Sequence, residues 1–280
     1  MHERSVRLRL FKDRLFRYLI VVPGVLVIIP FFVILFHVVR EGISSLNLEF
    51  ILRVPKPVGE TGGGILNGIV GTLLILIVAA IIAVPIGVAG GVYLSEMKTR
   101  RLTSLAKTAA NILQGVPSIV IGIVMYTWIV VPLRTFSALA GGVALAVMML
   151  PVVMKSTEET VNLVPNGLRE ASLALGAPYY KTILRVVIPT GLSGILSGVM
   201  LAVARVAGET APLLFTAFGN PYLSFNVAQP MAAIPLIIYD YAKSPYQDWI
   251  SKAWGASFVL IVIVLALNLL VRLRRKPSNA

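Results

Sequence analysis

The stretch LAVARVAGETAPLLFTAFGN, residues 201–220, decides how the rest of the chain is interpreted. It is apolar enough to lie in a bilayer, yet it carries Arg205 and Glu209. A charged side chain at the centre of a bilayer costs about 2.5 to 3.5 kcal/mol on insertion scales, so such residues usually serve a function. Residues four apart share one face of a helix, so a continuous helix here would let the two charges pair.

We predict that this segment lines a path for an anion. An arginine presents a fork of donors that matches the oxygens of a carboxylate or phosphate-like group, which suits Arg205 to this role. Thr210 or a neighbouring backbone group would partly satisfy Glu209, leaving the site with net positive character. The alternative is a purely structural ion pair that bridges two helices.

The composition of the whole chain indicates an integral membrane protein, because 57% of its 280 residues are hydrophobic and only 13% are charged. Its net charge of +13 comes from basic residues that flank apolar segments, so membrane topology explains it better than nucleic-acid binding does. The chain has no cysteine, and His2 and His37 are far apart, so neither a metal site nor a cofactor is expected.

The hydrophobic segments predict an all-α fold with six transmembrane helices. These lie at residues 18–39, 65–94, 105–131, 136–153, 190–218 and 254–271. An apolar piece at 227–239 is too short to cross and is predicted to be re-entrant or interfacial. With six crossings, most Lys and Arg residues fall on the side of the two termini, which the positive-inside rule places in the cytoplasm. The expected organisation is a cytoplasmic segment 1–17, a transmembrane domain 18–271 in the cytoplasmic membrane with a cytoplasmic loop 155–189, and a cytoplasmic tail 272–280.

Polar and helix-breaking residues interrupt the third of these segments. Gln114, Gly115, Pro117 and Ser118 predict a broken helix, which is tolerated at this depth only against protein or a watery cavity. Gln114 and Ser118 are four apart and could share a face with the anion path. Hydrogen bonding between helices is an equally good interpretation of both.

The loop PNGLREASLALGAPYYKTILRVVIP, residues 165–189, is the second informative stretch. It predicts a short helix with Leu168, Ala171 and Leu175 on an apolar face, a break at Gly176, and a second short helix that stops at Pro189. Such a bent pair suits either an amphipathic turn on the membrane surface or a rigid knob for another protein's groove.

Two sets of residues resemble a known family. Glu170, Ala171 and Gly176, with Ser172 in place of a second alanine, resemble the EAA loop of ABC importer permeases. The segments ARVAGETAPLLFTA (204–217) and GVPSIVIG (115–122) are similar to the PstA-type permeases of phosphate importers, and the resemblance covers nearly the whole chain.

This resemblance implies a type I, MetI-like permease fold that moves phosphate by alternating access. It implies a PstC-like permease partner, two PstB-like ATP-binding subunits and an extracytoplasmic PstS-like phosphate-binding protein. Residues in two regions acquire roles from it. The ATPase would be contacted by Glu170, Ala171, Ser172, Gly176, Ala177 and Pro178, and phosphate passage would involve Arg205 and Glu209.

The chain is not expected to hydrolyse ATP itself. A P-loop needs a glycine directly before its Lys-Ser or Lys-Thr pair, and Lys107, Lys155 and Lys181 all lack one. Competing hypotheses are a permease for molybdate or sulfate, an ion-coupled secondary anion carrier, a membrane enzyme and a purely structural subunit. A secondary carrier would not need the 165–189 knob, and an enzyme would need converging catalytic groups, which the spans do not offer.

Overall fold

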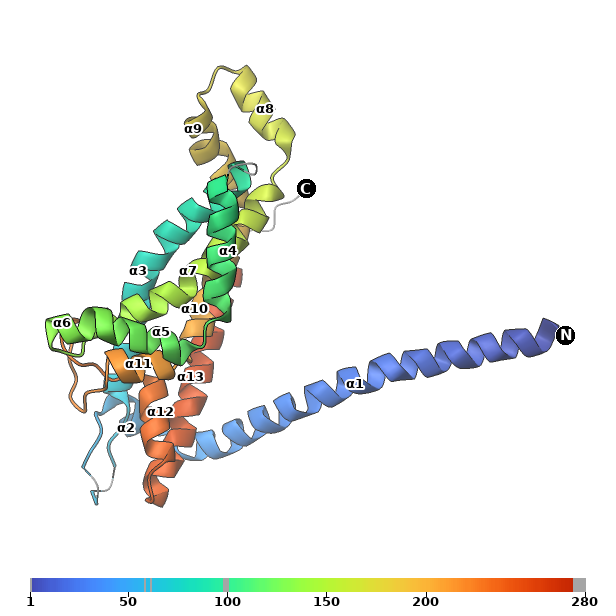
Figure 1. The fold of residues 1–280 in the computed structure, drawn as a ribbon. Coiled ribbons are helices and arrows are strands. Elements are labelled where there is room, and N and C mark those ends of the chain that lie inside the picture. Colours follow the sequence, from blue (N-terminus) through green and yellow to red (C-terminus); the bar gives the residue numbers. More distant parts are fainter. Residues whose placement is uncertain (1, 58, 61, 98–100, 274–280) are drawn as a thin grey trace.

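The computed structural model describes residues 2–57, 59–60, 62–97 and 101–273, with side chains between residues 12 and 269 (Figure 1). The described residues form helices and loops, without a β-strand, so the all-α prediction is confirmed. The helices are α1 (His2–Ser44), α2 (Leu48–Leu52), α3 (Leu66–Glu96), α4 (Arg101–Gly115), α5 (Ser118–Met125), α6 (Val131–Leu133), α7 (Ala138–Asn162), α8 (Asn166–Ala174), α9 (Tyr179–Thr182), α10 (Ile188–Val206), α11 (Ala211–Thr216), α12 (Ile234–Ala242) and α13 (Gln247–Leu273). Two π-helical turns, η1 (Tyr126–Val130) and η2 (Ile183–Val187), join some of them.

Three long helices, α3, α7 and α10, pack together at the centre of the molecule. Glycines allow the backbones of these helices to lie close together. A Cβ atom added at Gly91 of α3 would lie 2.4 Å from the backbone oxygen of Met154, and one added at Gly198 of α10 would lie 1.8 Å from Oγ of Ser156. Small residues let helices approach this closely in lipid. The prediction of a glycine-packed helix at 65–94 is therefore confirmed.

Two of the membrane segments are interrupted. Helix α4 and the segment Ser118–Leu133, formed by α5, η1 and α6, are together long and apolar enough for one span. They are bent by 104° at Val116 and Pro117, which confirms the predicted break. Beyond α10, residues 207–210 separate it from α11. Among the described residues, five helices are long and apolar enough to cross a bilayer, and the number rises to six when the bent pair is counted as one span.

The fifth predicted span differs from the structure at both ends. Helices α9, η2 and α10 form one continuous rod, Tyr179–Val206, so the predictions of a helix end at Pro189 and of a single helix over 190–218 were wrong. The π turn explains the first error. The Ile188 N–H donates to the Ile183 carbonyl, so the hydrogen-bond ladder widens just before Pro189, the residue that has no N–H to donate.

The fourth predicted span, 136–153, is too short. Helix α7 continues past Lys155 to Asn162, because a helix needs backbone hydrogen bonds and a packing surface and not an apolar sequence throughout. Its buried contacts continue to Thr157 and Val161, which are both fully buried.

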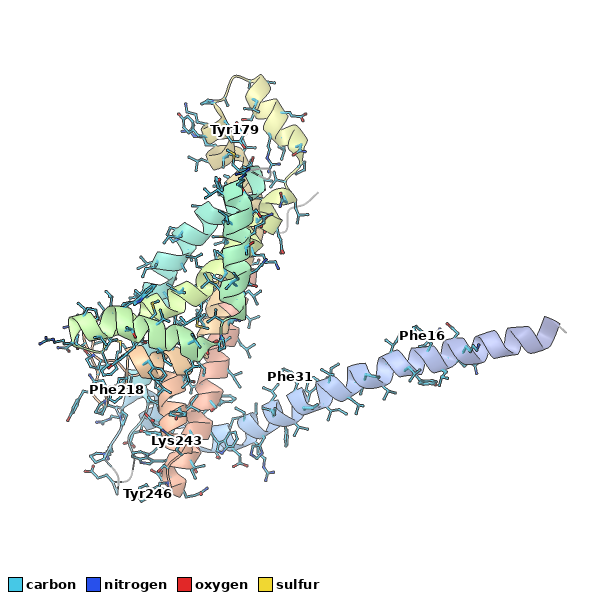
Figure 2. The ribbon with its side chains drawn as sticks, viewed as in Figure 1. Phe16, Phe31, Tyr179, Phe218, Lys243 and Tyr246 are labelled. Carbon is cyan, nitrogen blue, oxygen red and sulfur yellow. The ribbon has the colours of Figure 1, made fainter. Side chains whose placement is uncertain are left out.

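Helix α1 extends away from the other helices (Figure 1). No residue in the most apolar window of its segment Lys12–Ser44 is buried within this chain. Phe16 and Phe31 project from it without covering elements (Figure 2). Its contact with the body is near its C-terminal end, where the rings of His37 and Trp254 lie 4.8 Å apart. The predicted first span, 18–39, is thus one helix with little packing of its own.

The long helices end at two opposite regions (Figure 1). At one lie α8, α9 and the turn between them, residues 166–182, which we term the knob; at the other, the far end, lies α12, which packs on α13. Tyr179 lies in the knob, whereas Lys243 and Tyr246 lie at the far end (Figure 2). The short α12 agrees with the prediction that residues 227–239 do not cross, and their place in a membrane stays a prediction.

Candidate functional site

A largely buried ion pair ties the knob to the end of α3. The guanidinium of Arg169 in α8 lies 3.0 Å from Oε1 of Glu96, and only 15% and 11% of these side chains are exposed. The same guanidinium donates to the backbone oxygens of Val164 and Val161 at 2.8 and 3.0 Å. The hydroxyl of Tyr179 donates to the second carboxylate oxygen of Glu96. One carboxylate therefore holds both helices of the knob.

The predicted coupling residues lie on α8 and in the turn that follows it. The hydroxyls of Ser172 and Thr182 are 2.9 Å apart, which links α8 to α9. Gly176 has a φ of +78°, a left-handed conformation that glycine adopts without strain. The N–H of Ala177 donates to the Ser172 carbonyl at 3.2 Å, and Pro178 precedes the first residue of α9. Glu170 and Ala171 are exposed on α8.

The knob presents apolar side chains to its surroundings. Leu175 is 89% exposed, and Leu168, Leu173 and Tyr180 are also exposed. The predicted apolar face, which includes Ala171, therefore has no cover within the described chain. Both interpretations of this face, a membrane surface and another protein's groove, remain compatible with the exposure.

The structure corrects the predicted arrangement around Arg205. Arg205 is exposed in the last turn of α10, which ends at Val206, and Glu209 lies beyond that end. No ion pair joins Arg205 to Glu209 in the part of the chain that the structure describes. The predicted stacking on one helix face was therefore wrong. Gly208 and Pro212 explain the break, because glycine disfavours helix interiors and Pro212 cannot donate to the Gly208 carbonyl.

Glu209 and Thr210 are half-buried in this break. The Glu209 N–H donates to the Val206 carbonyl at 3.1 Å, and the Thr210 carbonyl accepts from Leu214 at 3.1 Å. Their backbones thus close one helix and open the next. The side-chain oxygen of Thr210 makes no cap hydrogen bond to α11.

The segments that follow the two interruptions pack on each other. A Cβ atom added at Gly122 of α5 would lie 2.7 Å from Cα of Pro212 in α11. Ser118, half-buried, begins α5. The break after Gln114 and the break after Arg205 therefore lead into one packed pair of short helices.

Gln114 lies in a different setting from Arg205. It is half-buried at the end of α4 and lines a cavity of about 180 Å³. The other residues of that cavity are Leu94, Lys107, Ala110, Asn111, Met154, Lys155 and Glu158. Within the described residues, no hydrogen bond or ion pair joins Gln114 or Ser118 to Arg205, Glu209 or Thr210. The sequence analysis did not bring the charged members of this cavity together, because Lys107 and Glu158 lie far apart in the sequence.

A larger cavity, of about 590 Å³, opens at the far end. Its lining includes the aromatic residues Tyr222, Tyr241 and Trp249. Burial raises the pKa of Tyr241 to about 12, and the charges of Asp248 and Asp240 act in the same direction. The cavity contains none of the predicted path residues.

Comparison with known proteins identifies the kind of chain that carries these features. Residues 83–275 match the family described as binding-protein-dependent transport system inner membrane component. The chain belongs to this family. The matched region covers every long helix except α1 and the start of α3, and it includes both interruptions and the knob.

Relatives of this inner membrane component are similar over most of their length. The chain is 43% identical over 242 residues to the phosphate transport system permease protein PstA of Pasteurella multocida, covering 86% of each chain. It is 41% identical to the PstA protein of Haemophilus influenzae, over 86% of this chain and 85% of that one. It is 35% identical to a probable PstA protein of Methanocaldococcus jannaschii, over 97% and 96%.

Solved structures show that this inner membrane component has the fold of ABC transporter permeases. A chain from inward-facing structures of the MetNI methionine ABC transporter superimposes with a TM-score of 0.64 at 22% identity, covering 76% of this chain and 96% of that one. A chain of an amino acid ABC transporter superimposes with a TM-score of 0.52 at 19% identity, over 74% and 92%. The predicted MetI-like permease fold is confirmed, while the orientation of the termini stays a prediction.

Proposed function

We propose that this chain is the permease subunit of an ATP-driven importer that moves inorganic phosphate across the cytoplasmic membrane. The substrate is supported by the relatives named PstA, which are 35 to 43% identical over most of their length. The observation that carries the site is Arg205. Its guanidinium is exposed beside a helix break and has no anionic partner among the described residues, so it is free to contact a passing anion.

The knob end would face the cytoplasm. With six crossings, the basic N-terminal segment, α4, the knob and the C-terminal tail would all lie on this side, and positive charge favours the cytoplasmic side of a membrane. The far end, with its 590 Å³ cavity, would face an extracytoplasmic binding protein.

The energy source would lie in partner subunits. The sequence has no P-loop, so two PstB-like ATP-binding subunits would hydrolyse ATP, and a PstC-like permease would form the other half of the path. The knob would dock on the ATPase through Glu170 and the turn at Gly176. ATP-driven closure would then move the rod Tyr179–Val206 directly, since it is one helix from the knob to Arg205. The ATPase contact on the knob and the anion contact at Arg205 would therefore both shift the position of the same helix.

The knob surface yields a test of this docking. Replacing Leu175 by glutamate should lower the amount of ATP-binding subunit that copurifies with the permease by about tenfold, because an apolar anchor in a partner's groove is worth about 1 to 2 kcal/mol or more. Leu163→Glu is the matched control, since Leu163 is 83% exposed but lies outside the knob. Unchanged copurification of the Leu175 variant would contradict docking and favour the membrane-surface interpretation.

Phosphate uptake by the reconstituted complex tests the proposed function itself. Arg205→Ala should lower uptake about tenfold or more, because hydrogen bonds to charged groups contribute about 1.5 to 3 kcal/mol. Arg205→Lys should keep part of the activity. Arg185→Ala, which removes an exposed arginine from the same rod, serves as the control.

Two results would overturn the proposal. Full uptake with an unchanged KM in Arg205→Ala would remove the anion-path role. Efficient uptake of sulfate or molybdate by the wild-type complex, without phosphate uptake, would replace the substrate.

A further inference from the structure

The 180 Å³ cavity between α4 and α7 has the composition of an anion site. On α4, Lys107, Asn111 and Gln114 follow one another at spacings of four and three residues, so they share one helix face. On α7, Lys155 and Glu158 are one turn apart. Two helices thus bring two ammonium groups, two amides and one carboxylate to the same cavity.

Among the described residues, most of these polar groups have no hydrogen-bond or ion-pair partner. Lys107 pairs with Glu158 at 2.5 Å, and only 15% of the Glu158 side chain is exposed. In the part of the chain that the structure describes, no ion pair or side-chain hydrogen bond engages Lys155, Asn111 or Gln114. The cavity therefore keeps one uncompensated positive charge and two amide groups able to donate.

Helix contacts place Lys155 on an open face of α7. The side of α7 that packs on α3 carries Val153 and Thr157, which contact the glycines Gly87 and Gly91. The side that packs on α10 carries Ser156 and Thr160, which contact the glycines Gly198 and Gly194. At about 100° per residue, Lys155 lies between the α10 side and the side where Glu158 meets α4. Glu159, also exposed, shares this open face without pairing to Lys155 among the described residues.

The cavity lies nearer to the knob than Arg205 does. Gly198 of α10 touches Ser156, the neighbour of Lys155, and Arg205 is seven residues farther along α10. At ~1.5 Å per residue, this separates the two levels by ~10 Å along the rod. An anion that passes Arg205 on its way to the knob end would meet this level next.

We propose that this cavity is a second anion station on the phosphate path, in which Lys155, Asn111 and Gln114 contact the anion and Glu158 competes with it for Lys107. The inference rests on the proposed function and deepens it. The cavity exceeds the ~30 Å³ that one water occupies in the liquid, so it can accept a tetrahedral oxyanion with part of its hydration shell. Two weak stations in series allow an anion to enter and to leave, whereas one strong site would retain it.

A purely structural interpretation explains fewer residues. A tie between α4 and α7 accounts for Lys107 and Glu158, which form the pair. It gives no role to Lys155, which is exposed and contacts no acidic group among the described residues. Lys155 is therefore the residue that separates the two interpretations.

The first experiment measures phosphate uptake by the complete complex in liposomes. Lys155→Ala should lower uptake at limiting phosphate at least fivefold by raising KM, and Lys155→Arg should restore most of it. Arg101→Ala, which removes an exposed cation from α4 outside the cavity, should match the wild type. Unchanged KM and uptake in Lys155→Ala would overturn the inference. If Lys155→Ala does not assemble, Lys155→Gln decides by the same readout.

The second experiment uses Glu158→Gln. If Glu158 competes with the anion, this change frees Lys107, so both KM and the maximal rate should fall at least twofold as phosphate leaves more slowly. A mere inter-helix tie predicts instead that Glu158→Gln and Lys107→Ala lose assembly alike with unchanged KM, and that result would overturn the competition.

Measuring the wild type and both variants in parallel tells a failure of the proposed function from a failure of the second anion station. A wild-type complex that imports no phosphate would defeat the proposed function. A defect in Arg205→Ala together with normal kinetics in Lys155→Ala would defeat only the second station.

Discussion

Replacing Glu96 by alanine is expected to destabilise the protein by about 3 kcal/mol and to lower phosphate uptake at least tenfold. The change leaves the Arg169 guanidinium mostly buried without its carboxylate, and breaking one partner out of a buried pair typically costs about 3 to 5 kcal/mol. The lower end applies because Arg169 keeps two backbone oxygens as acceptors. Tyr179 loses its acceptor in the same step, so both helices of the knob come loose from α3.

Thermal unfolding of the purified protein and the ratio of phosphate imported to ATP hydrolysed measure this effect. The ratio should fall, because a loosened knob transmits less of the ATPase movement. Glu96→Gln should lie between, since its amide oxygen can still accept from Arg169. Glu41→Ala is the matched control. It also removes a carboxylate from an arginine pair, but that pair is exposed and spans 3.8 Å, so its loss should cost less than 1 kcal/mol. Equal stability of the two alanine variants would contradict the buried tie.

Gly91→Ala is expected to prevent accumulation of folded protein in the membrane. The new Cβ would lie 2.4 Å from the Met154 backbone oxygen and 2.5 Å from Cβ of Thr157, neither of which can move without moving α7. Overpacking of this kind costs about 1 to 3 kcal/mol of stability and sometimes more. Here it would force α3 and α7 apart.

The neighbouring glycine provides the control. A Cβ atom at Gly90 would lie 2.7 Å from Cε of Met154, the flexible end of a side chain that can rotate away. The two variants differ by one position on the same helix and add the same methyl group. The yield of monodisperse protein in detergent should therefore fall strongly for Gly91→Ala and stay near wild type for Gly90→Ala. Similar yields would contradict the glycine-mediated packing.

Local sequence signals predicted much of the fold. The helix expected at 65–94 is found at Leu66–Glu96, and Gly115 with Pro117 correctly indicated the broken third span. Hydropathy predicted helix ends wrongly where a helix continues through polar residues or stops within an apolar stretch. Helix α7 continues through its polar end to Asn162, and the apolar stretch after Val206 is interrupted although it contains few polar residues.

The sites depend on contacts that a single sequence does not display. Nothing in the chain's local pattern pairs Glu96 with Arg169, which lie 73 residues apart. The helical spacing of Lys107, Asn111 and Gln114 was visible, but nothing in the sequence brings this face of α4 against Lys155 and Glu158 of α7. The residues proposed for the path, Arg205, Glu209, Thr210, Gln114 and Ser118, therefore stay predictions that the uptake measurements test.

The early end of α10 also determines how firmly Arg205 can hold its cargo. The unpaired carbonyls of a helix C-terminus carry roughly half a negative charge, and Arg205 lies in that last turn. The backbone thus attenuates the attraction of the guanidinium for an anion. An anion would therefore stay only briefly at Arg205, and rapid transport depends on such short residence times.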